Sequence, residues 1–377
     1  MMTNAGGTTK KRSRTNWFML LLNCFAVLSL LLAYAAAAFS PETMGYFTLF
    51  GLAYPFALLA NLLFMLFWYF KNRRYALISL SSILLGPAHL TAFFQVSFSG
   101  SVDTKSHQLK VLTYNVHVFD VFDKKDGPAT RDAIYDLLNR EQADVICFQE
   151  FYQSEKSKSY PTRDTLIEFL PSKYYHERYT HAISGQQYFG VVTLSKYPIL
   201  RKGFVPFATD VNNFCIYIDI LKGSDTIRVY NAHLQSIRFK KEDYDLASGK
   251  TEQSEIDDAS KRIARRLKSA FVKRQEQVDR IAASIRACPH PVILCGDFND
   301  PPVSYTYCTL TERLKDSFKS CGNGIGNTYI GAFPSFRIDY ILHSPTLETI
   351  EYETLPEKLS DHHAVTATLQ WRSVNTQ

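Results

Sequence analysis

The chain has 377 residues and a formal net charge of +6, and 46% of its residues are hydrophobic. The excess positive charge lies in the first hundred residues, which carry seven Lys or Arg and one acid, so the remainder balances at 35 basic and 35 acidic residues. A neutral remainder gives no electrostatic argument for nucleic-acid binding. The seven cysteines include no CxxC pair, so the usual sequence pattern of a zinc site is missing.

Three apolar runs near the N-terminus, at about 17–39, 43–70 and 75–99, contain no Asp, Glu, Lys or Arg. About 20 such residues are enough for a helix to cross the hydrocarbon core of a bilayer. Residues 1–99 are therefore predicted to be a membrane region with three transmembrane helices. Gly86-Pro87 and several polar residues interrupt the third run, which leaves open whether it spans.

The charges that flank these runs predict the orientation of the chain. Basic residues precede the first run (10–14) and separate the second from the third (71–74), whereas the loop between the first two has only Glu42. By the positive-inside rule, the N-terminus and the 71–74 loop are cytoplasmic. A third crossing then places the chain after residue 100 outside the cytoplasm, as in a protein of the cell inner membrane. A cleaved signal peptide at 10–38 would lead to the same placement.

After a short polar linker (100–108), the pattern changes to that of a mixed α/β domain over 109–372. Runs rich in β-branched and aromatic residues predict strands at 110–116, 143–148, 190–194, 214–220, 226–232, 291–294, 337–342 and 364–371. Helical periodicity covers 130–141, 259–287 and 302–310. Many strands with few helices favour a sandwich of sheets flanked by helices. The spacing of Cys308 and Cys321 leaves open whether they pair in an oxidising compartment.

The helix predicted at 259–287 has an apolar core face and an opposite basic face. The residues assigned to the basic face are Lys261, Arg262, Arg265, Arg266, Lys268, Lys273, Arg274, Arg280 and Arg286. This face is either solvated or in contact with anionic lipid headgroups, which a membrane tether would bring close. The polar segment 236–255 before it lacks periodicity and is predicted to be a surface loop.

Short polar clusters lie at the ends of several predicted strands. They are Thr113-Tyr114-Asn115, Phe148-Gln149-Glu150, Asn231-Ala232-His233-Leu234, Gly296-Asp297-Phe298-Asn299, Arg337-Ile338-Asp339-Tyr340 and Ser360-Asp361-His362. Hydrolysis of an anionic phosphoester needs charge neutralisation, an activated water and a proton for the leaving oxygen. Carboxylates, carboxamides and imidazoles gathered at strand ends supply such groups. Any one of these residues alone is equally well explained as a turn or core residue.

Residue chemistry suggests where a metal and a water would be held. Glu150 ends an apolar strand and, with Asn115 beside it, fits a Mg²⁺ site, because Mg²⁺ prefers oxygen ligands. Asp297 and Asn299 are two residues apart, and in an extended backbone their side chains would face the same way.

Two histidines are the titratable candidates. His233 and His362 can relay a proton or hydrogen-bond a phosphoryl oxygen near neutral pH. Asp339 lies within an otherwise apolar strand, where its charge is costly to bury without a partner. His362 is the expected partner.

Together with Gly190 to Pro198, the clusters resemble the ordered motif set of the endonuclease/exonuclease/phosphatase superfamily. The resemblance extends over about 109–371 and indicates a membrane-anchored member of bacterial type. It implies a DNase I-like fold, a four-layer α/β-sandwich with the site at one end of its paired sheets.

The resemblance also implies roles for individual residues and a cofactor, Mg²⁺ or Mn²⁺. The implied catalytic residues are His233, Asp297, Asn299, Asp339 and His362; the implied substrate-binding residues are Asn115, Tyr188 and Asn299; the implied metal ligands are Glu150, Asn115 and Asp361. Asp297 and Asn299 would orient the water or the phosphate. His362, held by Asp339, would contact the scissile phosphate.

Two positions depart from parts of the superfamily. Relatives that act on abasic DNA carry asparagine where this chain has His233, which is similar instead to secreted DNases, sphingomyelinases and inositol-phosphate phosphatases. His117 stands where some members place a second metal-binding acid, which counts against a two-carboxylate metal site there.

The predicted function is that of a membrane-anchored, Mg²⁺-dependent phosphoesterase of the nuclease or phosphodiesterase class, acting outside the cytoplasm. A sphingomyelinase-like phosphodiesterase for lipid headgroups and a non-catalytic membrane protein that binds phosphorylated ligands are the alternatives. No protein partner is indicated.

Overall fold

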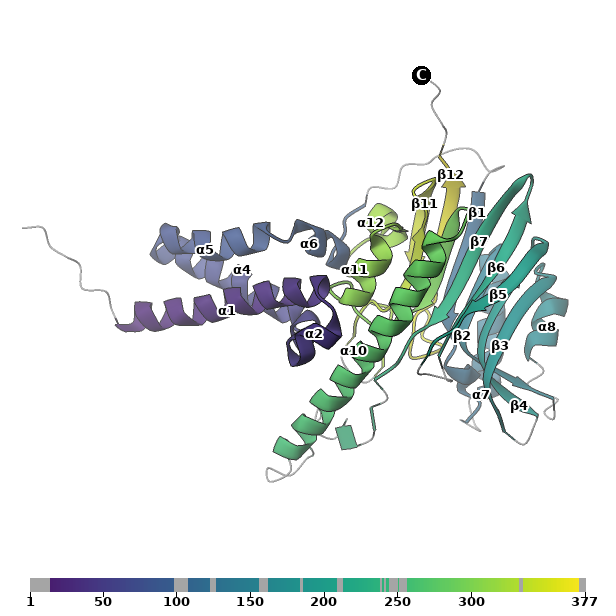
Figure 1. Ribbon diagram of the computed structural model, residues 1–377, viewed down its shortest axis with the longest axis horizontal. Helices are drawn as coiled ribbons and strands as arrows, with labels where there is room; N and C mark the ends of the chain where they lie inside the picture. The colour runs from purple at the N-terminus through teal and green to yellow at the C-terminus, as the bar shows by residue number, and fades with distance from the viewer. Residues whose placement is uncertain are drawn as a thin grey trace, which may run out of the picture.

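A computed structural model describes residues 14–97, 108–122, 127–155, 162–183, 186–208, 213–237, 239–240, 242–243, 250, 256–331 and 335–372. Figure 1 shows a group of long helices that extends to one side of a sandwich of two sheets. The predicted linker falls outside the described residues except for its last residue, and so does most of the predicted 236–255 loop.

The N-terminal region is helical. Its long helices are α1 (Arg14–Ala38), α4 (Tyr54–Lys71) and α5 (Arg73–Leu84), followed by the shorter α6 (Pro87–Phe93). By length and composition, α1 and α4 are each able to cross a membrane. The predicted third span is instead the pair α5 and α6, which is bent by 69° and qualifies only if both helices are counted as one span. The bend lies at Gly86-Pro87, because proline lacks the N–H that would continue the helix.

The second apolar run is divided into several helices and is not the single helix predicted. Residues 41–52 form α2 (Pro41–Met44), η1 (Gly45–Thr48) and α3 (Leu49–Leu52) in place of the start of one long helix. Gly45 has a φ of 57° and ends α2. Pro55 lies in the first turn of α4, where its missing N–H costs no hydrogen bond. The prediction of a continuous helix from residue 43 is therefore wrong.

Two sheets form the sandwich. The first has the order β11 (Leu347–Thr354), β12 (Val365–Trp371), β1 (Gln108–Asn115), β2 (Val145–Ser154), β4 (Gln187–Ser195) and β3 (Tyr174–Ile183). The second has the order β5 (Ile199–Val205), β6 (Phe214–Lys222), β7 (Asp225–His233), β8 (Val292–Asp297), β10 (Asp339–His343) and β9 (Lys315–Asp316). Each predicted strand is present, and β3, β5, β9 and β11 are additional.

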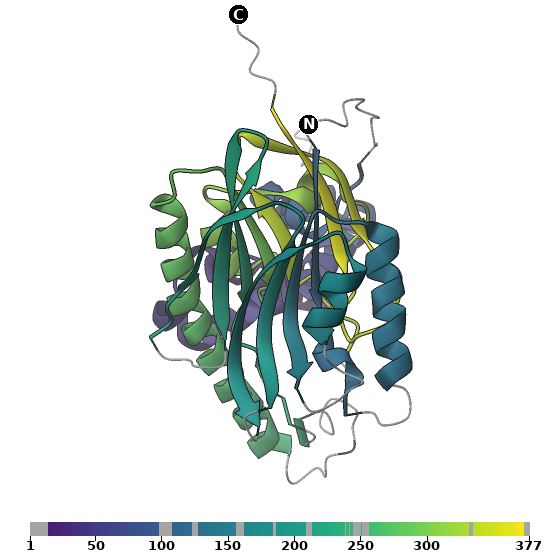
Figure 2. The ribbon, with the colours of Figure 1, turned by 90° about the vertical axis from the view of Figure 1, so that its right-hand side faces the viewer.

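Helices cover the outer faces of both sheets (Figure 2). α7 (Gly127–Glu141) and α8 (Thr162–Phe169) pack on the first sheet, and α10 (Ile256–Arg286) and α11 (Tyr305–Thr311) on the second. Buried aliphatic side chains such as Val111 and Ile218 fill the space between the sheets. The predicted α/β-sandwich is confirmed, and its layers run helix, sheet, sheet, helix.

The seven cysteines are free, with no disulfide between Cys308 and Cys321.

The helical region packs directly on the sandwich. Val303, which precedes α11, is buried among Leu30 and Tyr54 of the long helices. Arg337 is buried beside Asp316, just before the short helix α12 (Ser317–Cys321), and donates a 2.8 Å hydrogen bond to the carbonyl oxygen of Ala92. The two regions therefore share a continuous buried contact.

Candidate active site

The sheet topology brings the polar clusters to one end of the sandwich. β1 and β2 are parallel, and so are β7 and β8, so the carboxyl ends of each pair lie at a common edge. Asn115 lies opposite Gln149 in the first pair. Asp297 lies opposite His233 on one side and opposite Asp339 on the other. Residues distant in sequence become neighbours through these registers.

Asn115 joins two carboxylates of this cluster. Its Nδ2 donates to Oε1 of Glu150 at 3.3 Å and to Oδ2 of Asp297 at 3.1 Å. Its Oδ1 accepts a 3.1 Å hydrogen bond from the backbone N–H of His117, which fixes the orientation of the amide. Asn115 is itself buried, so its amide reduces the repulsion between two carboxylates in a low-dielectric setting.

A bulge in β2 directs Glu150 into the cluster. The register with β4 shifts between Phe148 and Phe151, and Glu150 has a φ of 50°. A bulge re-aims a side chain that regular alternation would point elsewhere. Burial acts to raise the pKa of Glu150, but the imidazole of His233 and the amide of Asn115 outweigh it and hold the pKa below its usual value.

His362 and Asp339 form a hydrogen-bonded pair that faces Asp297. Nδ1 of His362 lies 2.8 Å from Oδ2 of Asp339, and its Nε2 lies 3.8 Å from Oδ2 of Asp297. Burial opposes the imidazolium form, but the charges of Asp339 and Asp297 raise the pKa of His362 to about 10. Burial also raises the pKa of Asp297 to about 6, against the opposing attraction of His362. His362 is therefore an imidazolium at neutral pH, oriented by Asp339.

His233 completes the cluster from the second sheet. Its Nε2 lies 3.7 Å from Oε1 of Glu150 and 3.8 Å from Oδ2 of Asp297. This nitrogen is buried and has no hydrogen-bond partner among the described residues. Asn213 donates to the carbonyl oxygens of His233 and Leu234 and so holds the end of β7 in place. A buried ring nitrogen directed at two carboxylates is available to a ligand bound there.

Asn299 reaches Asp297 by a turn and not by strand alternation. β8 ends at Asp297, and Asn299 has a φ of 54°. Its backbone N–H donates to Oδ1 of Asp297 at 2.8 Å, and its Nδ2 donates to Oδ2 at 3.2 Å. The two side chains do meet as predicted, but the expected extended backbone is wrong. The reason is that an aspartate side chain can accept the N–H two residues on and stabilise a turn.

Gly296 allows the close approach of β7 and β8 beneath the site. Its φ is 142°, and a Cβ atom there would lie 1.9 Å from the carbonyl oxygen of Ala232. Only glycine fits without moving the backbone that carries Asp297 and His233.

Two predicted site residues lie at the edge of this arrangement. Tyr188 is opposite Gln153, beyond Glu150 along β2, and its ring lies 5.4 Å from that of Tyr179. Asp361 accepts a 3.3 Å hydrogen bond from the Ser360 hydroxyl. Tyr188 is therefore displaced from Glu150 by three residues along the β2–β4 pair, and the contacts described for Asp361 do not include Glu150.

The donor atoms fit a hard divalent cation. Asp297, Asp339 and His362 offer ligand atoms within 4.8 Å of one another. Asp339 is, however, already hydrogen-bonded to Nδ1 of His362, so these two residues act better as a histidine–carboxylate pair. The oxygens of Glu150 and Asp297 remain, with the Asn115 amide between them, and carboxylate oxygens are what Mg²⁺ prefers.

A buried polar network ties the two sheets together beneath these residues. Nε2 of Gln149 donates to Oδ1 of Asn231 at 2.7 Å, and Nδ2 of Asn231 donates to the carbonyl oxygens of Phe148 and Val192. Sequence reasoning placed Gln149 and Asn231 in polar clusters without a role. The sequence feature that could have revealed this role is their position inside otherwise apolar runs, because a buried polar side chain needs hydrogen-bond partners.

Arg274 does not belong to the basic face assigned from the sequence. Its side chain is fully buried, pairs with Asp300 at 3.2 Å and donates a 2.8 Å hydrogen bond to the carbonyl oxygen of Gln235. Its spacing from Phe271 and Val278 places it on the core stripe of α10. This contact links the segments that follow His233 and Asn299.

Comparisons with known proteins agree with this arrangement. The model of the endonuclease/exonuclease/phosphatase family matches residues 112–362, and that of a domain of unknown function matches residues 16–93. No curated protein sequence matches the chain.

Solved structures show the same fold at low identity. An endonuclease/exonuclease/phosphatase from Beutenbergia cavernae is 17% identical with a TM-score of 0.51, over 70% of this chain and 72% of that chain. An endonuclease/exonuclease/phosphatase family protein from Leptotrichia buccalis is 19% identical with a TM-score of 0.50, over 69% of this chain and 98% of that chain. The human Nocturnin catalytic domain with bound sulfate is 14% identical with a TM-score of 0.51, over 72% and 96%.

At these identities the structural likeness shows the fold alone. The family model, in contrast, spans well over half of the chain and both histidines of the cluster. The chain therefore belongs to the endonuclease/exonuclease/phosphatase family, whose members hydrolyse phosphoester bonds.

Proposed function

We propose that this chain is a membrane-anchored, divalent-metal-dependent phosphoesterase that cleaves phosphodiester or phosphomonoester bonds outside the cytoplasm. The observation that carries the proposal is the His362–Asp339 pair, which faces Asp297 beside His233 and Glu150. A cationic imidazolium next to carboxylates that can hold a metal suits an anionic substrate and its more negative transition state.

Each residue then has a role. Glu150 and Asp297, with Asn115 and Asp361 nearby, would hold Mg²⁺ or Mn²⁺, which when bound supplies charge neutralisation and a more acidic water. His362 donates from Nε2 to a phosphoryl oxygen, while Asp339 holds Nδ1. Removing one such donor typically costs about 100-fold to 1,000-fold in turnover.

Asn299 and His233 would orient the reacting groups and transfer a proton. Asn299 holds the Asp297 carboxylate through two hydrogen bonds and orients it toward water or phosphate. The unpartnered Nε2 of His233 is placed to exchange a proton with the water or the leaving oxygen. Tyr188 would contact the substrate beyond the scissile bond.

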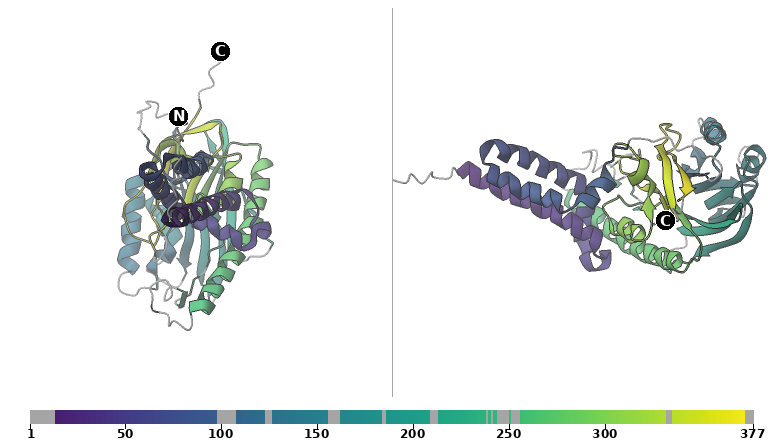
Figure 3. Two further views of the ribbon diagram at one scale, coloured as in Figure 1. Left: turned by 90° about the vertical axis from the view of Figure 1, so that its left-hand side faces the viewer. Right: turned by 90° about the horizontal axis from the view of Figure 1, so that it is seen from above.

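The charges of the helical region support the membrane placement. Lys71, Arg73 and Arg74 lie at the turn between α4 and α5, at the end of the helices away from the sandwich (Figure 3). Basic residues at that end favour the cytoplasmic side. With α1, α4 and the bent α5–α6 pair as three crossings, the sandwich lies outside.

One observation favours a lipid substrate as the second candidate. The segment after Asn299 carries Val303 into the core of the helical region, which holds the catalytic domain close to the bilayer. A phosphodiesterase for phospholipid headgroups would benefit from that position. A binding-only protein would tolerate the loss of catalytic groups, yet every group named above is present in the chain.

The test is hydrolysis by the full chain in detergent micelles, with Mg²⁺, Mn²⁺ or EDTA. The substrates are plasmid DNA, sphingomyelin and other phospholipids in mixed micelles, bis-p-nitrophenyl phosphate and small phosphomonoesters. His362→Ala should abolish metal-dependent turnover, whereas the neighbouring His363→Ala, whose Nδ1 lies 3.1 Å from the Glu357 carbonyl oxygen, should not. Equal activity of both variants would refute the mechanism.

The membrane placement has a separate test. A reporter that is active only outside the cytoplasm, fused after Gln377, should be active in cells. Activity of a cytoplasmic reporter at the same position would refute the three-crossing topology and point to a substrate inside the cell.

A further inference from the structure

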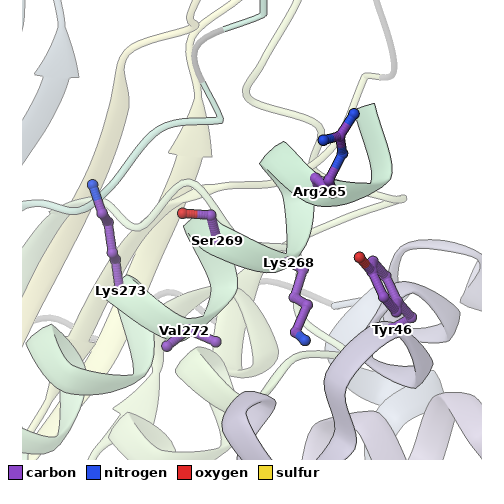
Figure 4. A pocket seen from close by; sticks show the side chains of 6 residues that line it. All are labelled: Tyr46, Arg265, Lys268, Ser269, Val272 and Lys273. Atoms are coloured by element: carbon purple, nitrogen blue, oxygen red, sulfur yellow. The ribbon is translucent and has the colours of Figure 1, made fainter. Parts of the chain in front are cut away.

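A shallow hollow of about 310 Å³ lies between α10 and the segment that joins α1 to α4 (Figure 4). Its lining residues are Tyr46, Arg265, Lys268, Ser269, Val272 and Lys273. Three of these six are cationic and none is acidic. The hollow therefore presents positive charge over a small apolar floor.

These three cations differ from most other basic residues of the same helix. Arg262 pairs with Asp243, Arg274 with Asp300 and Arg280 with Glu276. In contrast, no carboxylate in the described part of the chain pairs with Arg265, Lys268 or Lys273. The described contacts of Arg265 and Lys268 are with the Lys261 carbonyl oxygen and the face of the Tyr46 ring. The α10 cations left without a counter-charge thus include three that line one hollow, and of these Lys268 points toward Tyr46 (Figure 4).

The hollow lies beside the segment that joins the two candidate membrane spans α1 and α4. Tyr46 belongs to η1, between the last residue of α1 and the first of α4, and its side chain and that of Phe47 are 51% and 56% exposed. Exposed aromatic rings at the end of apolar helices are typical of the interface between membrane and water. Figure 1 shows α2 beside the middle of α10, where the backbone N–H of Glu42 donates to the Gln275 side chain, and the N-terminal end of α10 continues beyond α2.

We propose that this hollow binds the phosphate of an anionic phospholipid headgroup at the membrane surface. The Arg265 guanidinium matches phosphate oxygens in geometry, and the lysines and the Ser269 hydroxyl supply further donors. Lipid phosphate is the anion concentrated at this level, and the acyl chains of the same lipid would lie beside α1. The proposal rests on the membrane embedding proposed above and not on hydrolysis.

Such binding would fix how the catalytic domain sits on the bilayer. Lys273 adjoins Arg274, which contacts Gln235 and Asp300 behind the active site. A lipid bound to α10 would therefore contact the same helix whose Arg274 holds the segments that follow His233 and Asn299.

The test is native mass spectrometry of the full chain in detergent, titrated with phosphatidylglycerol or phosphatidylcholine. The chain carries His362→Ala, so that turnover cannot consume the ligand and the readout stays independent of the proposed hydrolysis. The variant with Arg265→Gln, Lys268→Gln and Lys273→Gln should bind phosphatidylglycerol about 100-fold more weakly. The matched control, Arg201→Gln with Lys315→Gln and Lys358→Gln, removes the same charges from exposed positions elsewhere and should bind as the parent.

Three outcomes would overturn the proposal. The first is equal binding of phosphatidylglycerol by the triple variant and its control, and the second is equal binding of both lipids by the parent. The third is full displacement of the lipid by inorganic phosphate, which would make the hollow a site for free phosphate. Should the triple variant not fold, Lys268→Met, which keeps an aliphatic chain on Tyr46, should still weaken lipid binding about fivefold.

Discussion

Gln149 donates a 2.7 Å hydrogen bond to Oδ1 of Asn231, across the space between the two sheets. Both side chains are fully buried. Gln149 adjoins Glu150, and Asn231 lies two residues before His233, so this bond sets the spacing between site residues that belong to different sheets.

Asn231→Leu should therefore lower both stability and turnover. The substitution removes one hydrogen bond from the Gln149 amide, which keeps those to Thr113 and Cys147, and the two that Asn231 donates to the carbonyl oxygens of Phe148 and Val192, at a net cost of about 0.5–1.5 kcal/mol for each lost hydrogen bond. Thermal unfolding and kcat on bis-p-nitrophenyl phosphate measure the effect. Asn139→Leu, at an exposed position on α7, is the control. Unchanged unfolding of the Asn231 variant would contradict the role of the pair.

Asp339→Asn should reduce kcat about 100-fold or more with little change in KM, because Asp339 orients His362 and favours its cationic form. Steady-state kinetics separate this effect from weaker substrate binding. Glu353→Gln removes an exposed carboxylate from β11 and should leave both constants unchanged. A raised KM at constant kcat would indicate that Asp339 acts on binding instead.

Gly296→Ala should destabilise the chain by about 1–3 kcal/mol or more, because the new Cβ would overlap the Ala232 carbonyl oxygen. Gly223→Ala is a matched control, since Gly223 also has a positive φ but has open space around it, and should cost only about 1 kcal/mol. Thermal unfolding compares the two. Equal losses would show that conformation alone, and not the strand contact, requires glycine at 296.

The buried imidazole of His343 should make the free energy of unfolding depend on pH. It is buried on β10, with Nδ1 3.0 Å from the Ser344 carbonyl oxygen and Nε2 2.9 Å from the Thr349 hydroxyl. Burial lowers the pKa of His343, although Asp316 opposes the shift. The unfolded chain, where histidine has a pKa of about 6.5, therefore binds a proton more readily than the folded chain.

The folded protein should thus lose stability as the pH falls below about 6.5, and His343→Gln should lose less over the same range. Thermal unfolding of both proteins between neutral and acidic pH measures this difference. Parallel losses in the two proteins would show that His343 does not contribute to acid sensitivity.

Strand prediction succeeded where strands are buried and failed where they are exposed. β1 and β8 read as apolar runs because nearly all their side chains are buried. β3, β5 and β11 were missed, since they lie at or near sheet edges and carry many polar or partly exposed side chains. The central strands that carry the site were thus the ones open to prediction.

The amino-acid sequence by itself determined the two-part organisation, the family and the residues that gather at the site, because apolar runs and ordered polar clusters are properties of the chain. The tertiary structure alone decided which atoms meet. The bridge from Asn115 to Asp297, the turn at Asn299, the burial of Arg274 and the contact of Lys268 with the Tyr46 ring all depend on register and packing between distant segments. Local periodicity carries no information about such distances.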